Sequence, residues 1–184
     1  LEGARAVYGR LRSAPTPFAA CLGRFWTAQV DLQCGRFRNA RDQCLSGLDL
    51  AEKSGRSPDI LKFRLLQSQV ELGLGRWAEA AEAAKTAAEI ASKILYHSER
   101  KTALMFNGLA LTGAGRLAEA RAAAGNLREL IDRTGCPAHA RYLYALQAAL
   151  ALKDGDATEA VEWQDKAVAL LSGQIDNYDD HAFF

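Results

Sequence analysis

Gly75-Arg76-Trp77-Ala78-Glu79-Ala80 is one of four copies of a short phrase from which the fold of this 184-residue chain can be inferred. The other copies are Gly35-Arg36-Phe37-Arg38-Asn39-Ala40, Gly115-Arg116-Leu117-Ala118-Glu119-Ala120 and Gly155-Asp156-Ala157-Thr158-Glu159-Ala160. The spacing between successive copies is constant, and a small residue precedes each glycine by seven positions: Ala28, Ser68, Gly108 and Ala148. A fixed period of this length indicates an array of structural repeats.

Apolar residues around each glycine have the spacing of amphipathic helices. Before Gly75 lie Leu61, Leu65, Leu66, Val70, Leu72 and Leu74, and after it lie Ala80, Ala83, Ala84, Ala87 and Ile90. This pattern predicts two helices that meet at the glycine. Because glycine can adopt the left-handed conformation that ends a helix, each repeat is predicted to be a helical hairpin with the glycine at its corner.

The composition favours the same fold class. Ala occurs 35 times and Leu 25 times, whereas the strand formers Val and Ile occur 5 times each. Pro17, Pro58 and Pro137 mark the starts of first helices, and Ser57 is predicted to be the N-cap ahead of Pro58. We therefore predict an all-α chain with helices over residues 2–13, 17–34, 38–54, 58–74, 78–95, 98–114, 118–133, 137–153 and 157–172, and a further helix that starts at 177–184.

These residues resemble the tetratricopeptide repeat (TPR) family. The match lies at the small position, at the corner glycine and at the alanine five positions later: Ala28, Gly35, Ala40, Ser68, Gly75, Ala80, Gly108, Gly115, Ala120, Ala148, Gly155 and Ala160. The period of 40 exceeds the usual value of about 34, as in variants found in bacterial signalling proteins and transcription regulators. The resemblance implies one right-handed α-α superhelix, a TPR-like solenoid over residues 1–184, with an orphan helix at 1–13, repeats at 17–54, 58–95, 98–133 and 137–172, and the start of a further helix at 177–184.

The resemblance also implies a concave groove lined by the first helix of each repeat. The candidate groove residues are Phe25, Gln29, Lys62, Leu65, Gln69, Thr102, Met105, Leu109 and Tyr142. This lining is more apolar than charged, and the Lys and Asn residues that bind a carboxylate in chaperone-binding members are absent. An alternative interpretation places some of these apolar side chains in the core between repeats. Where the family has Leu just before the small residue, this chain has polar residues, which are expected to be exposed or paired: Thr27, Gln67, Asn107 and Gln147.

No combination of residues points to catalysis or to a bound cofactor or metal. Residues 73–78 and 113–118 both match G-x-G-x-x-A, but a dinucleotide site requires a strand before the glycines, and a helix is predicted there. His97, His139 and His181 occur singly, without the partner four residues away that a metal-binding helix carries. We expect a protein that is not an enzyme and that has no cofactor.

Charge and cysteine content limit the possible partners. The net charge of +1 does not favour nucleic acid, and no apolar run reaches the roughly 18 residues of a membrane helix. The charge is +5 over residues 1–70, +1 over 71–137 and −5 over 138–184, which reflects ordinary variation between solvated faces, a polarised surface, or head-to-tail stacking of copies. Cysteines lack the spacing of a zinc site and are predicted to be small core residues in a reducing cytoplasm: Cys21, Cys34, Cys44 and Cys136.

These observations favour a function in protein–protein interaction. We expect a non-catalytic scaffold whose groove binds a peptide, a helix or another domain of the same chain, within a larger bacterial regulatory or signalling protein. The chain begins with Leu1 rather than Met, which indicates a piece of a longer polypeptide. The alternative is a structural spacer or self-assembly element that stacks through exposed ends, where residues 1–13 and 177–184 lack a partner helix.

Overall fold

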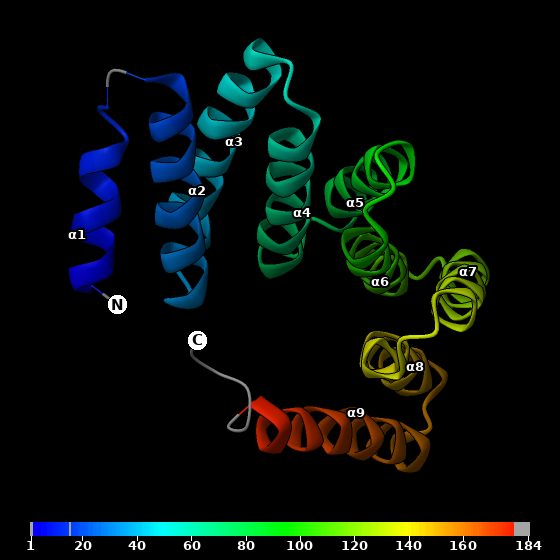
Figure 1. Cartoon of the computed structure of the whole chain (residues 1–184). Helices are drawn as coiled ribbons and strands as arrows, with labels where there is room; N and C mark the ends of the chain where they lie inside the picture. Colours follow the sequence, from blue (N-terminus) through cyan, green and yellow to red (C-terminus); the bar gives the residue numbers. More distant parts are fainter. Residues whose placement is uncertain (1, 15, 179–184) are drawn as a thin grey trace.

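The computed structural model describes residues 2–14 and 16–178 of the chain (Figure 1). This part contains nine α-helices, one short 3-10 helix and no strand, which confirms the predicted all-α class. The helices are α1 (Glu2–Leu11), α2 (Pro17–Gln33), α3 (Phe37–Ser54), α4 (Ser57–Gly73), α5 (Trp77–Lys93), α6 (His97–Gly113), α7 (Leu117–Thr134), the 3-10 helix η1 (Pro137–His139), α8 (Ala140–Asp154) and α9 (Ala157–Tyr178). None of these helices combines the length and the hydropathy that crossing a membrane requires.

Consecutive helices pack against each other in order along an arc (Figure 1). In the first three hairpins, the second helix contacts its own first helix and the first helix of the next hairpin; in the fourth, α9 packs on α8. The first helices also contact one another, α2 with α4, α4 with α6 and α6 with α8. They therefore lie on the inside of the arc. We call α2, α4, α6 and α8 the inner helices, and α3, α5 and α7 the outer helices.

The corner glycines all adopt the left-handed conformation. The backbone angle φ is 70° at Gly35, 70° at Gly75, 75° at Gly115 and 85° at Gly155. The residue after each glycine donates its backbone N–H to the carbonyl five positions earlier, as Arg76 does to Glu71 at 2.9 Å. This Schellman arrangement satisfies carbonyl groups that the helix end would leave unpaired. The predicted corners of the hairpins are thus confirmed.

The corners between hairpins use the same conformation, at Gly55, Leu95 and Gly135. Leu95, with φ of 60°, is the one non-glycine residue in this conformation within the described part of the chain. An L-residue is strained there because its Cβ approaches the following carbonyl oxygen. The Leu95 side chain is 73% exposed, so little packing offsets this strain.

The small positions lie where helices cross closely. Ala28, Ser68 and Gly108 are buried, and Ala148 is half-buried. A methyl group on Gly108 would collide with Leu146 of the neighbouring inner helix α8. The alanines five positions after each corner are buried as well: Ala40, Ala80, Ala120 and Ala160. Close approach of the helices therefore requires these side chains to be small.

The first glycine of each G-x-G-x-x-A match has a packing role. The Phe37 ring occupies the place where a side chain on Gly73 would lie, and the Trp77 ring does the same at Gly113. Both aromatic residues begin outer helices, so each outer helix rests on the inner helix of the next hairpin. A helix precedes both glycine pairs, as predicted, and a dinucleotide site has no strand to start from.

The polar residues before the small positions are paired in three of the four repeats. The Thr27 hydroxyl donates to the Gly23 carbonyl at 2.7 Å, and the Asn107 amide donates to the Ala81 carbonyl at 3.0 Å. Gln67 accepts a hydrogen bond from an arginine of its own helix at 3.1 Å. Their polarity thus serves contacts within and between helices, because a buried or half-buried polar group is costly without a partner.

Two buried carboxylates connect successive helices. Glu71 on α4 accepts a hydrogen bond from Nε of Arg41 on α3 at 2.8 Å, and Asp31 on α2 is held in the same way by arginines of α1 and of the corner. Ala81 and Leu111 occupy the equivalent positions of the next hairpin, and both belong to a buried apolar cluster. Equivalent positions of successive hairpins therefore accept either a buried carboxylate paired with a partly exposed arginine or two apolar side chains.

Most helix ends lie one or two residues from the predicted bounds, and three differences are informative. α9 runs without a break to Tyr178, so the gap expected between residues 172 and 177 is wrong; residues 179–184 of the expected further helix lie outside the described part. Gly173 lies within α9, because glycine weakens a helix without necessarily ending it. α8 begins only at Ala140, after the tight turn η1. α4 begins at Ser57 itself, because Pro58 fits the first turn of a helix, so the predicted N-cap role of Ser57 is wrong.

Gly108 and Gly125 test the requirement for small residues at helix crossings. Both lie inside helices, so alanine at either position raises helix propensity by about 1 kcal/mol. A methyl group on Gly125 meets no atom within 4 Å, and we expect Gly125→Ala to stabilise the protein by about 0.5–1 kcal/mol. Gly108→Ala forces the buried Leu146 to move and should destabilise by about 1–2 kcal/mol. Urea unfolding measures both changes, and effects of the same sign would contradict the prediction.

Leu95 tests the conformation of the corners. Replacing it with glycine removes a strain of about 1–2 kcal/mol, part of which is offset by the greater entropy of the unfolded chain. We expect Leu95→Gly to stabilise the protein by about 0.5–1 kcal/mol. Gly135→Ala, at the equivalent corner of the next repeat, should have the opposite effect. Thermal unfolding followed by circular dichroism gives both values, and a lower melting temperature for Leu95→Gly would refute the proposed strain.

Candidate functional site

All nine candidate groove residues lie on inner helices. Phe25 and Gln29 are on α2, Lys62, Leu65 and Gln69 are on α4, Thr102, Met105 and Leu109 are on α6, and Tyr142 is on α8. Lys62 is exposed, and the other eight are half-buried. We call the surface formed by these nine residues the inner face. Each of its side chains leaves part of its area open to solvent.

The apolar members of the inner face also contact the core. Phe25 packs edge-on against the buried Phe63, with 5.7 Å between ring centroids. Met105, Leu109 and Tyr142 pack on a buried cluster formed by α5, α6, α7 and α8. These side chains therefore contact the core between repeats, as the alternative interpretation expected, and part of each remains open to solvent.

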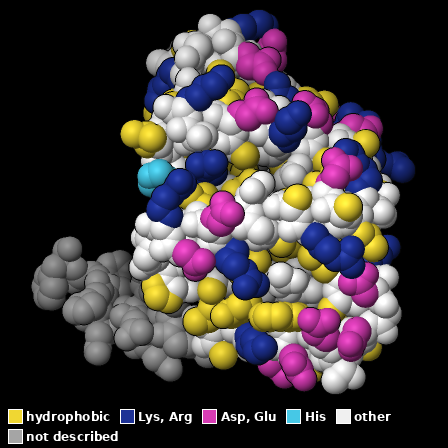
Figure 2. Space-filling model, turned by 90° about the vertical axis from the view of Figure 1, so that its right-hand side faces the viewer, with side chains coloured by type: hydrophobic (Ala, Val, Ile, Leu, Met, Phe, Trp, Pro, Cys, Tyr) yellow, Lys and Arg dark blue, Asp and Glu magenta, His cyan; other side chains and the backbone are white. Residues whose placement is uncertain are grey.

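The convex side of the molecule has a different character. Figure 2 shows acidic and basic side chains interspersed over this side, with hydrophobic bands between them. Arg116 and Glu119, at the start of the outer helix α7, form one of the exposed ion pairs at 2.6 Å. On the inner face, by contrast, only Lys62 is charged. The inner face is thus better suited to an apolar partner surface than the convex side.

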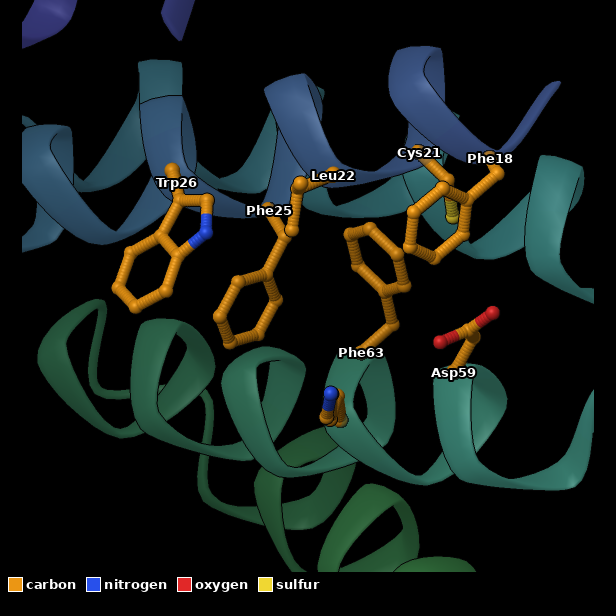
Figure 3. A pocket seen from close by; sticks show the side chains of 8 residues that line it. Phe18, Cys21, Leu22, Phe25, Trp26, Asp59 and Phe63 are labelled. Carbon is orange, nitrogen blue, oxygen red and sulfur yellow. The ribbon is translucent and has the colours of Figure 1, made fainter. Parts of the chain in front are cut away.

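A cavity of about 90 Å³ lies between the inner helices α2 and α4 (Figure 3). Half of the lining residues are aromatic, and Cys21 and Leu22 complete the apolar part; the aromatic residues are Phe18, Phe25, Trp26 and Phe63. In Figure 3 the labelled side chains of α2 face Phe63 and Asp59 of α4 across this gap. Phe25 and Lys62 belong both to the inner face and to the lining of the cavity.

Three large apolar side chains at this cavity are exposed. Phe18, Leu22 and Trp26 are 52%, 37% and 41% exposed. They follow one another at intervals of four positions on α2 and therefore share one side of the helix. Exposed apolar side chains that gather around a cavity are typical of an interaction site.

Of the two charged residues that line the cavity, Asp59 has an ion-pair partner and Lys62 has none in the described part of the chain. Asp59 forms an ion pair with Arg56 at 3.0 Å, and the Arg56 guanidinium lies over the Phe18 ring, 4.9 Å from its centroid. Lys62, one turn further along α4, has no hydrogen-bond or ion-pair partner among residues 2–14 and 16–178. The cavity therefore combines an apolar interior with an unpaired cation in its lining.

The buried cysteines are not poised for nucleophilic chemistry. Burial raises the pKa of the Cys21 thiol, and the Asp59 carboxylate raises it further. Burial also raises the pKa of Cys44, to about 12. Because the thiolate is the reactive form, both thiols are expected to be inert near neutral pH. The predicted core position of Cys34 is wrong: its side chain is exposed, because α2 ends here and the chain turns.

A second polar cluster lies where α6 meets the start of α8. Lys101 is buried, and its Nζ lies 2.7 Å from Nδ1 of His139. Since an ammonium group can only donate, Nδ1 is the acceptor. The His139 ring stacks on Tyr142 of the inner face, with 5.6 Å between centroids. Burial lowers the pKa of His139 below its ordinary value of 6.5, and the charges of Lys101 and Arg141 lower it further.

Sequence reasoning did not identify Phe18, Trp26, Asp59 or Lys101 as site residues. Phe18 and Trp26 form an i, i+8 pair with Leu22 between them, and a helical projection of residues 17–33 would have revealed this stripe. Lys101 carries no such signal, because its partner is 38 residues away in the sequence.

Among the described residues, no group of three or more His, Cys, Asp or Glu side chains is arranged to hold a metal ion. The sequence matches no protein-family model and no curated protein. Function is therefore inferred from the geometry of the inner face and of its cavity.

Protonation of His139 should weaken the contact between α6 and α8. The folded-state pKa of His139 lies below 6.5, so neutral His139 contributes to the free energy of unfolding. This contribution is fully present above about pH 6.5 and is lost as the pH falls through the folded-state pKa. We expect the free energy of unfolding to decrease between about pH 7.5 and about pH 5, and to decrease less in His139→Asn, which keeps an acceptor but gains no proton. Urea unfolding at each pH measures the difference.

The matched control for this experiment is His97→Asn. His97 is exposed at the start of α6, so this variant should follow the wild-type pH dependence. A His139→Asn variant that also keeps the full wild-type pH dependence would show that the Lys101–His139 contact does not contribute.

Proposed function

We propose that this chain is a non-catalytic protein-interaction module of the TPR-like solenoid type. Its inner face binds an amphipathic peptide or helix from a partner protein, or another domain of the same polypeptide. The observation that carries the proposal is the inner face itself, where eight of nine side chains are uncharged and half-buried. A larger bacterial regulatory or signalling protein is the context that we propose for the module.

Energetics support a partner at this face. Full burial of a large apolar side chain is worth about 1.5–3 kcal/mol, and a half-buried side chain gains only part of this. Side chains such as Leu65, Met105 and Leu109 therefore gain further stabilisation when another apolar surface covers them. They already rest on the core, so little ordering is needed before a partner binds.

The repeat geometry supports the TPR-like part of the proposal. Four hairpins of the same period share left-handed corner glycines and small residues at the helix crossings. Their first helices lie side by side on the inside of the arc, where that family presents its groove. Catalysis is not part of the proposal, because Cys21 and Cys44 are buried thiols with raised pKa and His139 is engaged by Lys101.

A second candidate function is self-assembly through the end helices. Val7 on α1 and Val161 on α9 are both more than half exposed, so each end of the described array presents an apolar side chain. Copies that stack through these helices would cover such residues. This function requires association between copies, whereas the first requires a different partner.

Substitutions on the inner face test the first proposal. Peptides selected from a random dodecapeptide phage library on the purified chain should bind Gln69→Arg and Met105→Glu at least about tenfold more weakly than wild type, because both introduce charge into an apolar contact. Isothermal titration calorimetry gives the affinities, and circular dichroism verifies that each variant is folded. Lys85→Glu, on the outer helix α5, is the control and should bind as wild type does.

Selected peptides that bind all variants equally would contradict a binding role for the inner face. Sedimentation velocity over a range of concentrations separates the two candidates. A chain that selects no peptide and associates with itself as its concentration rises would favour self-assembly through the end helices.

A further inference from the structure

We infer that the cavity between α2 and α4 anchors a partner segment in which one large apolar side chain stands next to a carboxylate. This inference rests on the proposed function, because it specifies what the inner face recognises. It follows from the size of the cavity, from the side chains exposed around it and from the charges in its lining.

The size of the cavity fits one side chain of a partner protein better than a free small molecule. Sites for cofactors and drug-sized ligands enclose about 300–1,000 Å³. The present cavity encloses about 90 Å³, and most of its wall consists of aromatic and aliphatic side chains. One aliphatic or aromatic side chain from a larger partner is therefore the occupant that fits.

The exposed stripe on α2 indicates that the partner extends beyond the cavity. Phe18, Leu22 and Trp26 span just over two turns of helix, which corresponds to about 12 Å. A segment laid along this stripe would cover all three while its anchor enters beside Phe25 and Phe63 (Figure 3). In protein interfaces, buried aromatic residues near the centre typically supply most of the free energy of binding.

The charges around the cavity favour an acidic residue next to the apolar partner side chain that enters it (the anchor). Asp59 is already paired with Arg56, so it is not free to receive a cation. Lys62 and the indole Nε1 of Trp26 are donors without a hydrogen-bond partner in the described part of the chain. A carboxylate next to the apolar anchor would meet these donors, whereas a basic residue there would face Lys62 and Arg56. Residues 1–70, which contain α2 and most of α4, carry a net charge of +5 and attract an acidic segment over a longer distance.

The test begins with the sequences that a random dodecapeptide phage library yields on the purified chain. We expect a consensus with one large apolar residue and at least one Asp or Glu within two positions of it. Leu22→Ala and Lys62→Glu should each weaken the consensus peptide at least about tenfold, because the first removes part of the apolar wall and the second reverses the charge. Both residues are exposed, so neither substitution should impair folding.

The chain offers matched controls for both variants. Leu45, on the outer helix α3, is 37% exposed, as is Leu22, so Leu45→Ala removes an equivalent side chain at another place. Lys85→Glu makes the same charge reversal on α5. Both controls should bind as wild type does. In addition, a peptide whose acidic residue is replaced by lysine should regain affinity for Lys62→Glu, an effect that a structural role of Lys62 would not produce.

The outcomes separate this inference from the proposed function. Binding that is lost in Gln69→Arg but unchanged in Leu22→Ala and Lys62→Glu would leave the inner face as the binding surface and overturn the cavity as its anchor site. A consensus that is basic or lacks an apolar residue would overturn the inferred chemistry. A chain that selects no peptide and forms concentration-dependent oligomers would overturn both.

Discussion

Each hairpin of this chain depends on helices of the next hairpin, because two helices alone cannot bury their apolar residues. The inner helix α4 has buried residues on several sides, whereas the outer helix α5 buries one face that consists of alanines. Helices can approach this closely only where side-chain volume is missing. Gly108 provides the space for Leu146 of the next hairpin, and Gly47 provides it for Phe63. The stability of one repeat is therefore set largely by residues of its neighbours.

The left-handed corners keep these contacts in register. Because these corners recur at a constant interval along the chain, equivalent positions of successive hairpins meet in the same way, and their chemistry can vary without a change of geometry. The contact between Arg41 and Glu71 is a partly buried ion pair, and the equivalent residues Ala81 and Leu111 belong to one apolar cluster. Desolvation of the buried carboxylate offsets much of the attraction in such a pair, so it contributes little more than a well-packed apolar pair. The array therefore tolerates both.

The inner face follows from the same construction. Side chains of the inner face contact the core on one side and solvent on the other, so the face is incompletely covered. Tyr142 shows how the inner face is connected to buried residues. Its ring stacks on His139, which in turn accepts a hydrogen bond from the buried Lys101. At the other end of the described array, Phe25 rests on Phe63 and borders the cavity. Because these side chains already rest on the core, the partner binding that we propose would require little ordering of the inner face.

The helical class, the four hairpins, their glycine corners and the helices that carry the inner face could all be predicted from the residues alone. These features are local or recur with the period of the repeat, so propensity, spacing and glycine chemistry were sufficient to predict them. The folded chain was needed to show that Phe18 and Asp59 meet at a cavity, that Lys101 pairs with His139, and that Cys34 is exposed. Those contacts join residues about one repeat apart, or depend on how a helix end meets solvent, and they differ from one repeat to the next. A repeat pattern reports what the copies share, whereas the candidate site arises from the side chains in which they differ.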